Sequence, residues 1–274
     1  AAIPRSMPLF MDFHKFDKSE NLTVDKVIQA HIADVSIQHQ YGVRYHQFWV
    51  NPEAGTVFCL TEGPDAKTCE LVHQLAHGNL ACAITEVEPG EHKLIMGDRS
   101  VVEHGVVKNK DGTADLGFRH ILVASVRSVA EPGDATKNTM LEFPQWARDY
   151  IQDKLRQHHG RELSTGFDDS ITAVFNEASD ALQCSRALQD TFLAFSGTPK
   201  VVFKIGISGD QPVTANGEFF TKAIKLARSL CTTAENNQIM VSSMVRKNCG
   251  VERPESSRSL RYLEQSDEEL ICSI

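Results

Sequence analysis

In the first third of the chain, hydrophobic positions change from strand spacing to helical spacing and back. Residues 8–14 form a mostly apolar run typical of a strand, and apolar residues then recur at helical spacing from Val24 to Ile37. Thr23 directly precedes that segment and can cap the helix. The β-branched and aromatic runs at residues 43–50 and 56–62 are separated by a short loop with Pro and Gly, which predicts a hairpin.

A second helix and a final strand follow the hairpin. The helix is expected to begin after Pro64, with Asp65 near its cap, and to end at Gly78. Residues 81–87 have the pattern of a strand, so the predicted order is βαββαβ, the ferredoxin-like unit. Pro-Gly, Gly-Asp and Asp-Gly pairs interrupt any long period in residues 89–117, which we expect to be a linker.

The second half of the chain predicts another unit of the same kind. We expect strands and helices in the order strand 120–126, helix 140–158, hairpin 162–165 with 171–175, helix 179–195, strand 201–207, helix 218–233 and strand 239–242. The predicted fold class is therefore α+β, with two ferredoxin-like domains at residues 7–88 and 118–250. Residues 251–274 form a polar tail, and residues 1–6 have the character of an expression remnant.

Composition and charge exclude several classes of protein. Of the 274 residues, 41% are hydrophobic, and no apolar run approaches the roughly 20 residues needed to span a bilayer. The formal net charge is −8 and no basic cluster is present, which argues against binding to nucleic acid. The seven cysteines are scattered without a C-x-x-C pair, which favours a reducing cytoplasmic location.

Histidines are concentrated in the first predicted domain. More than half of the eleven lie between His14 and His77. His73 and His77 are four residues apart, which places both rings on one face of the second helix, within reach of a single ion. Asp12 and His14 share one face of the first strand, and imidazole with carboxylate suits Ni, Zn, Fe or Mn. For each of these histidines, packing or an interface remains an equal alternative.

Residues 7–87 contain five short motifs: PLFMDFH at 8–14, AHIAD at 30–34, YGV at 41–43, VFCL at 57–60 and VHQLAHG at 72–78. With these motifs the segment resembles the DUF4242 family, whose members include a nickel-binding protein. The resemblance implies a ferredoxin-like and usually dimeric domain, with a metal site formed by histidines and acidic residues of the motifs. We rank the candidate ligands in the order His73, His77, His14, then His31 and Asp12, with Cys59 last because a half-buried strand cysteine is usually a packing residue.

The second half contains the motifs HILVASV at 120–126, HGRELSTG at 159–166, DDSITAVF at 168–175, KIGISG at 204–209, FFTKAIKLAR at 219–228 and QIMVSS at 238–243. In order and spacing, the segment resembles the class III adenylate and guanylate cyclase homology domain. Such enzymes hold two divalent ions with two carboxylates. By this resemblance Ser125 replaces the first carboxylate, and Asp169 or Asp168 occupies the second position unless both simply form a turn.

The same resemblance places Lys225 and Ser229 where these enzymes carry the transition-state Asn and Arg. Loss of such charge stabilisation typically costs several kcal/mol per group, so the domain is expected to be a pseudoenzyme whose binding of nucleotide is doubtful. Our hypothesis is a homodimeric, cytoplasmic protein that binds or senses nickel, or alternatively zinc or copper, with the degenerate cyclase-like domain used for dimerisation or regulation. The alternatives are an active cyclase gated by metal and a dimeric ferredoxin-like heme or monooxygenase-type enzyme.

Overall fold

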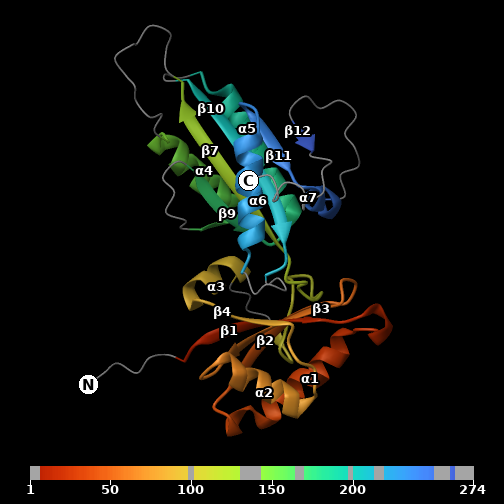
Figure 1. Ribbon diagram of the computed structural model, residues 1–274. Helices are drawn as coiled ribbons and strands as arrows, with labels where there is room; N and C mark the ends of the chain where they lie inside the picture. Colours follow the sequence, from red (N-terminus) through yellow and green to blue (C-terminus); the bar gives the residue numbers. More distant parts are fainter. Residues whose placement is uncertain are drawn as a thin grey trace, which may run out of the picture. The chain divides into compact units, whose positions relative to one another are not determined.

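The computed structural model describes residues 7–97, 102–129, 143–163, 170–196, 200–212, 219–249 and 260–262. The chain forms two compact units that divide between Phe118 and Arg119, with Gln211–Phe220 returning to the first unit. Each unit contains one six-stranded sheet with helices packed on it (Figure 1). No helix within the described ranges combines the length and the apolar character that crossing a bilayer requires.

The N-terminal domain has the predicted βαββαβ order. Its elements are β1 (Leu9–Lys15), α1 (Val24–Ile37), β2 (Arg44–Asn51), β3 (Thr56–Glu62), α2 (Ala66–Ala76) and β4 (Ala83–Glu86). The strands are arranged as β4-β1-β3-β2, which is the ferredoxin-like order, and α1 and α2 lie on one face of the sheet (Figure 1). Thr23 accepts a hydrogen bond from the Lys26 amide and Asp65 accepts one from the Thr68 amide, so both predicted helix caps are present.

Residues 89–117 differ from the predicted linker because they contain ordered elements of this domain. Helix α3 (Pro89–Met96) buries Ile95 and Met96, and strands β5 (Val102–Glu103) and β6 (Val106–Val107) extend the sheet beyond β2. Val106 pairs with Phe48 of β2, and both side chains are buried. Strands of two residues are too short to produce a detectable alternation, and their position depends on a partner far away in the sequence.

Strand register determines which side chains meet on the face covered by α1 and α2. Asp12 of β1 lies opposite Cys59 of β3, and Cys59 lies opposite Phe48 of β2. Since successive side chains of a strand alternate between the two faces, His14 lies on the same face as Asp12, next to Val57. Polar groups from β1 and β3 therefore lie beneath the helices, within an otherwise apolar row.

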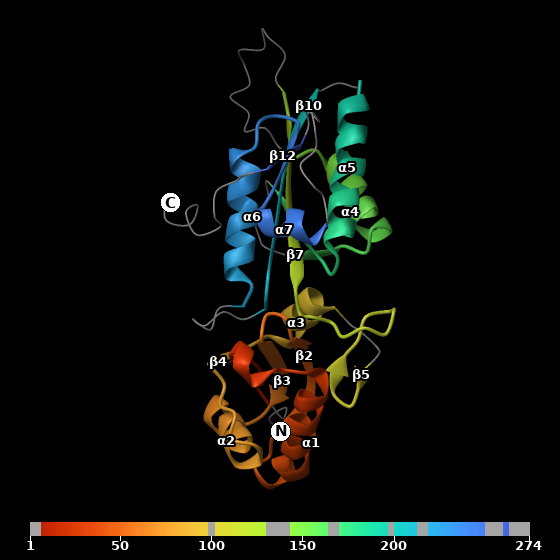
Figure 2. The same cartoon turned by 90° about the vertical axis from the view of Figure 1, so that its right-hand side faces the viewer.

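The second domain contains the same core order with two added strands. Its elements are β7 (Arg119–Ser128), α4 (Gln145–Gln157), β8 (Arg161–Leu163), β9 (Ile171–Phe175), α5 (Ala178–Ala194), β10 (Val201–Asp210), α6 (Thr221–Thr233), β11 (Gln238–Val241), α7 (Ser243–Asn248) and β12 (Leu260–Tyr262). The order β10-β7-β9-β8 is again ferredoxin-like, which confirms the predicted fold class, while β11 and β12 continue the sheet beside β10. Helices α4 and α5 cover one face and α6 covers the other (Figure 2).

Two boundaries in this domain differ from the sequence pattern. Helix α4 begins at Gln145, directly after Pro144, rather than at Met140, and residues 140–142 lie outside the described ranges. Strand β12 comes from the segment expected to be a polar tail, and Leu260 pairs with Ile239 of β11. Its pairing partner is nonlocal, so no local pattern indicates it.

Gly206 of β10 allows α6 to approach the sheet closely. A Cβ atom at this position would lie 2.2 Å from the Ala227 carbonyl oxygen and 2.4 Å from the Cys231 nitrogen, which are backbone atoms that cannot rotate away. We therefore expect Gly206→Ala to destabilise the second domain by about 1–3 kcal/mol through overpacking. Gly90→Ala is the matched control, because nothing lies within 4 Å of a Cβ atom there. Thermal unfolding checks this, and equal midpoints for both variants would contradict it.

Candidate metal centre

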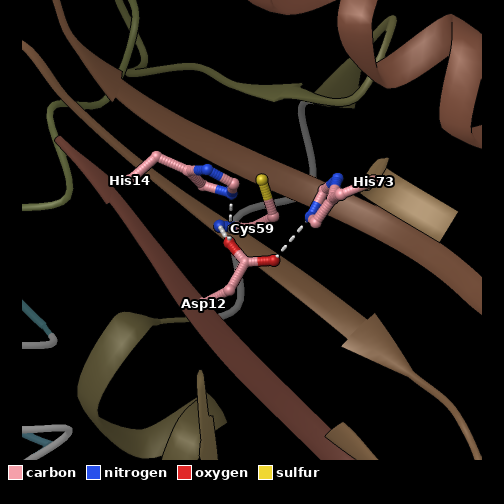
Figure 3. Close-up of side chains that lie close together, drawn as sticks. All are labelled: Asp12, His14, Cys59 and His73. Carbon is pink, nitrogen blue, oxygen red and sulfur yellow. Dashed lines mark hydrogen bonds and ion pairs between the residues drawn. The ribbon is translucent and has the colours of Figure 1, made fainter. Parts of the chain in front are cut away.

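Four side chains able to bind a metal ion converge beneath α2. Asp12 and His14 come from β1, Cys59 from β3 and His73 from α2, and one potential ligand atom from each lies within 4.8 Å of the others. All four are buried, with exposed fractions of 1–7%. Figure 3 shows the two imidazoles and the sulfur atom gathered around the Asp12 carboxylate. We refer to Asp12, His14, Cys59 and His73 as the β1–β3 cluster.

The Asp12 carboxylate is the centre of this cluster. Its Oδ1 accepts a hydrogen bond from the Cys59 amide at 2.9 Å, and its Oδ2 lies 2.9 Å from His73 Nε2 (Figure 3). His14 Nε2 approaches Oδ1 at 3.2 Å. Burial alone would raise the pKa of Asp12, but the charges and hydrogen bonds of His14 and His73 outweigh it and hold that pKa well below its usual range. Asp12 is therefore a carboxylate at every physiological pH.

A second group of ligands shares His73 with the first. His73 Nδ1 lies 3.1 Å from Asp34 Oδ2 of α1 and 3.1 Å from His77 Nε2, and His77 Nε2 lies 3.2 Å from the same Asp34 oxygen. We refer to Asp34, His73 and His77 as the α1–α2 cluster. The His73 imidazole thus presents one ring nitrogen to each cluster. Burial lowers the pKa of His73, but its hydrogen bonds to Asp12 and Asp34 raise it more, to about 10.

The chemistry of the β1–β3 cluster fits a divalent transition-metal ion. Within the described part of the chain, Nδ1 of the buried His14 makes no hydrogen bond and Nε2 lies 3.2 Å from the Asp12 carboxylate, so this imidazole can serve as a ligand. Two imidazoles, a carboxylate and a thiol are ligands of zinc, nickel and copper sites. Around a tetrahedral ion with bonds of about 2.0–2.3 Å, ligand atoms lie about 3.3–3.8 Å apart, which the observed convergence approaches. Burial and the nearby carboxylates raise the Cys59 thiol pKa, so this ligand requires a cation beside it to ionise.

Most of the ligands predicted from sequence meet here, with one exception. His73, His77, His14, Asp12 and Cys59 all belong to one of the two clusters. His31 of α1 does not, because its ring packs against Phe48 at 5.4 Å between centroids and against the backbone at Gly105, where an added Cβ would lie 2.4 Å from the ring. Burial lowers the pKa of His31 and favours its neutral form.

Asp34 is the residue of the two clusters that the ranking from sequence did not include. It lies on the buried stripe of α1 together with Val27 and His31, at positions i, i+4 and i+7 of that helix. Helical periodicity assigns this acidic residue to the core. A buried carboxylate requires a charged or hydrogen-bonded partner, so this position was the sequence signal for a functional role. Its partners are on α2, some forty residues further along the chain, and only the fold shows them.

The residues singled out in the second domain form no comparable cluster among those the structure describes. Ser125 lies on β7, and Lys225 and Ser229 lie on α6, which packs on the same sheet. Neither group of potential metal ligands in the described ranges includes a residue of this domain. Asp168 and Asp169 lie outside the described residues.

Comparison with known proteins separates the two halves of the chain. Residues 10–87 match the family described as nickel responsive protein SCO4226-like. The crystal structure of SCO4226 from Streptomyces coelicolor A3(2) is 39% identical over 29% of this chain and 94% of that chain, with a TM-score of 0.27. No curated protein sequence matches the chain.

Cyclase domains are found among the similar structures, and each covers about half of this chain. An adenylate/guanylate cyclase/hydrolase from Silicibacter pomeroyi is 22% identical over 54% of this chain and 90% of that chain, with a TM-score of 0.39. The guanylyl cyclase domain of the RhoGC fusion protein from Blastocladiella emersonii is 11% identical over 49% and 84%, with a TM-score of 0.38. The fold of the second domain is assigned from its strand order. TM-scores of 0.38 and 0.39 carry no information about activity.

The raised pKa of His73, which belongs to both clusters, predicts how the stability of the domain depends on pH. His73 retains its proton in the folded domain up to about pH 10, whereas an unfolded histidine loses it near pH 6.5. The folded state therefore binds more protons between these values, and its stability should fall as the pH rises from about 6.5 to about 10. Urea denaturation in the presence of a chelator measures this slope. His73→Gln should flatten it and His39→Gln, at an exposed position, should not; an unchanged slope in His73→Gln would refute the assignment.

Proposed function

Because its N-terminal domain belongs to the SCO4226-like family of nickel-responsive proteins, we propose that this protein binds nickel, or alternatively zinc or copper, at the β1–β3 cluster. The observation that carries the proposal is the burial of four different donor side chains from two strands and a helix around one point. A buried cluster of this kind is costly unless its members are paired or hold a metal ion. Two imidazoles and one sulfur favour a borderline ion over magnesium or calcium.

Each residue has a definite task in this proposal. Asp12, held by the Cys59 amide, supplies a fixed negative charge. His73 binds through Nε2 and donates its Nδ1–H to Asp34, which fixes the ring orientation and strengthens the ligand. When bound, the ion supplies positive charge that stabilises a thiolate at Cys59.

The α1–α2 cluster serves as the outer support in this arrangement. Asp34 lies on the far side of the His73 ring, and the His77 ring lies beside Asp34. His77 also accepts a hydrogen bond from the Asn79 amide through Nδ1, which orients the ring after the end of α2. The alternative arrangement, with the ion between Asp34, His73 and His77, predicts the opposite order of mutational effects.

Calorimetry with protein lacking a His tag tests the site. We expect His14→Gln to weaken nickel binding by at least about tenfold, because it removes a ligand, and His77→Gln to weaken it less, because His77 supports His73 and Asp34 without contacting the ion. His46→Gln is the matched control, since its ring pairs with Glu62 away from both clusters. No binding of nickel or zinc by the unmodified protein would reject the proposal, and a larger effect of His77→Gln would place the ion in the other cluster.

We further propose that the protein is a homodimer and that its second domain lacks cyclase activity. Ser125, Lys225 and Ser229 carry neither the carboxylate nor the charge pattern that class III cyclases use, and a symmetric dimer would repeat the same substitutions in both sites. Light scattering should give twice the chain mass, and incubation with ATP or GTP and Mn²⁺ should give no cyclic nucleotide above a blank. A monomer at micromolar concentration would contradict the first part, and cyclic product the second.

A further inference from the structure

A cavity of about 210 Å³ lies beside the β1–β3 cluster. Three of the four cluster residues, His14, Cys59 and His73, line it, so an ion held by them would face this space. Residues of α1, β2 and β3 complete the lining. A single water molecule needs about 10–15 Å³, so the cavity holds far more than a water bound to the ion.

Part of the cavity wall is apolar. Val27, Phe48 and Val57 line it, and each is at most 8% exposed. His31 also lines it and is 9% exposed, and its Nδ1 makes no hydrogen bond within the described part of the chain. A buried nitrogen without a partner is costly, so this atom favours a ligand that brings a polar group to the same space.

Charge indicates what kind of ligand fits. Lys26 is the basic side chain of the lining, but its Nζ donates hydrogen bonds to the backbone oxygens of Glu20 and Asn21 at 2.8 and 2.9 Å. The Asp34 carboxylate also lines the cavity. Glu20 lines it as well, and Asp12 belongs to the adjoining cluster, so the carboxylate groups around this space disfavour an anionic ligand.

We propose that the bound ion keeps one coordination position open toward this cavity, and that the position accepts a small neutral organic molecule with one donor atom and an apolar body. The inference rests on the proposed function, because it requires an ion in the β1–β3 cluster. An open position is what distinguishes metal sites that handle ligands from closed structural sites. The apolar body would lie against Val27, Phe48 and Val57, which gives selectivity by size and polarity.

The test uses the full chain loaded with nickel and titrated with three probes, monitored by the nickel absorption bands. We expect 4-phenylimidazole to bind at least about tenfold more tightly than imidazole, because the phenyl ring is buried against the apolar wall. The third probe, 4-phenylimidazole with a carboxylate at the para position of the phenyl ring, should bind more weakly than the neutral compound because it carries a negative charge. Equal affinities for imidazole and 4-phenylimidazole on nickel-loaded protein would overturn the cavity proposal alone, whereas protein that binds no nickel would reject the proposed function.

Variants of α1 place the effect in the cavity. Ala30 lines it, so Ala30→Phe should fill the space and remove the preference for 4-phenylimidazole while nickel affinity stays unchanged. Gln29→Phe, at the neighbouring exposed position, should keep the preference. If circular dichroism shows that Ala30→Phe does not fold, Ala30→Leu provides a smaller replacement. A preference that survives in a folded, nickel-binding Ala30 variant would overturn the assignment.

Discussion

The His73 imidazole lies between two buried carboxylates, with Nε2 2.9 Å from Asp12 and Nδ1 3.1 Å from Asp34. Through this one ring, α2 is joined to β1 and to α1. Two buried carboxylates beneath the helices would be unfavourable without a cation, and His73 supplies it when protonated. A metal ion in the β1–β3 cluster would take over that role on one side and leave Asp34 to hold the ring on the other. The arrangement of both helices on the sheet and the chemistry of the site therefore depend on the same contact.

This dependence connects metal affinity to protons. A ligand must lose its proton to bind an ion, and both His73 and Cys59 have pKa values raised by their surroundings. Binding would therefore release protons, and affinity should increase with pH even though the stability of the protein without an ion decreases. The two trends are opposite because His73 acts as the cation in the protein without an ion and as a ligand in the protein that holds one.

The parts of the fold governed by local chemistry could be predicted from the sequence, and the nonlocal parts could not. The cap residues Thr23 and Asp65 and the bounds of β3 follow from neighbouring side chains, and the two ferredoxin-like units follow from the order of such elements. The spacing of His73 and His77 predicted that they share a helix face, but it did not indicate that His73 is only 1% exposed, because its contacts with Asp12 of β1 and Asp34 of α1 are nonlocal. The role of Asp34 was hidden for the same reason: its value as a support depends on a helix elsewhere in the sequence.

X-ray absorption spectroscopy at the nickel edge can show whether an ion binds among the imidazoles, carboxylate and thiol of the β1–β3 cluster. For the nickel-loaded protein, we expect a sulfur atom among the atoms bound to nickel, together with the outer-atom scattering typical of imidazole. The sulfur contribution should disappear in Cys59→Ser, while Cys69→Ser, at another buried cysteine, should leave it unchanged. A shell of oxygen atoms alone, as in aqueous nickel, or a sulfur signal that persists without Cys59, would contradict it.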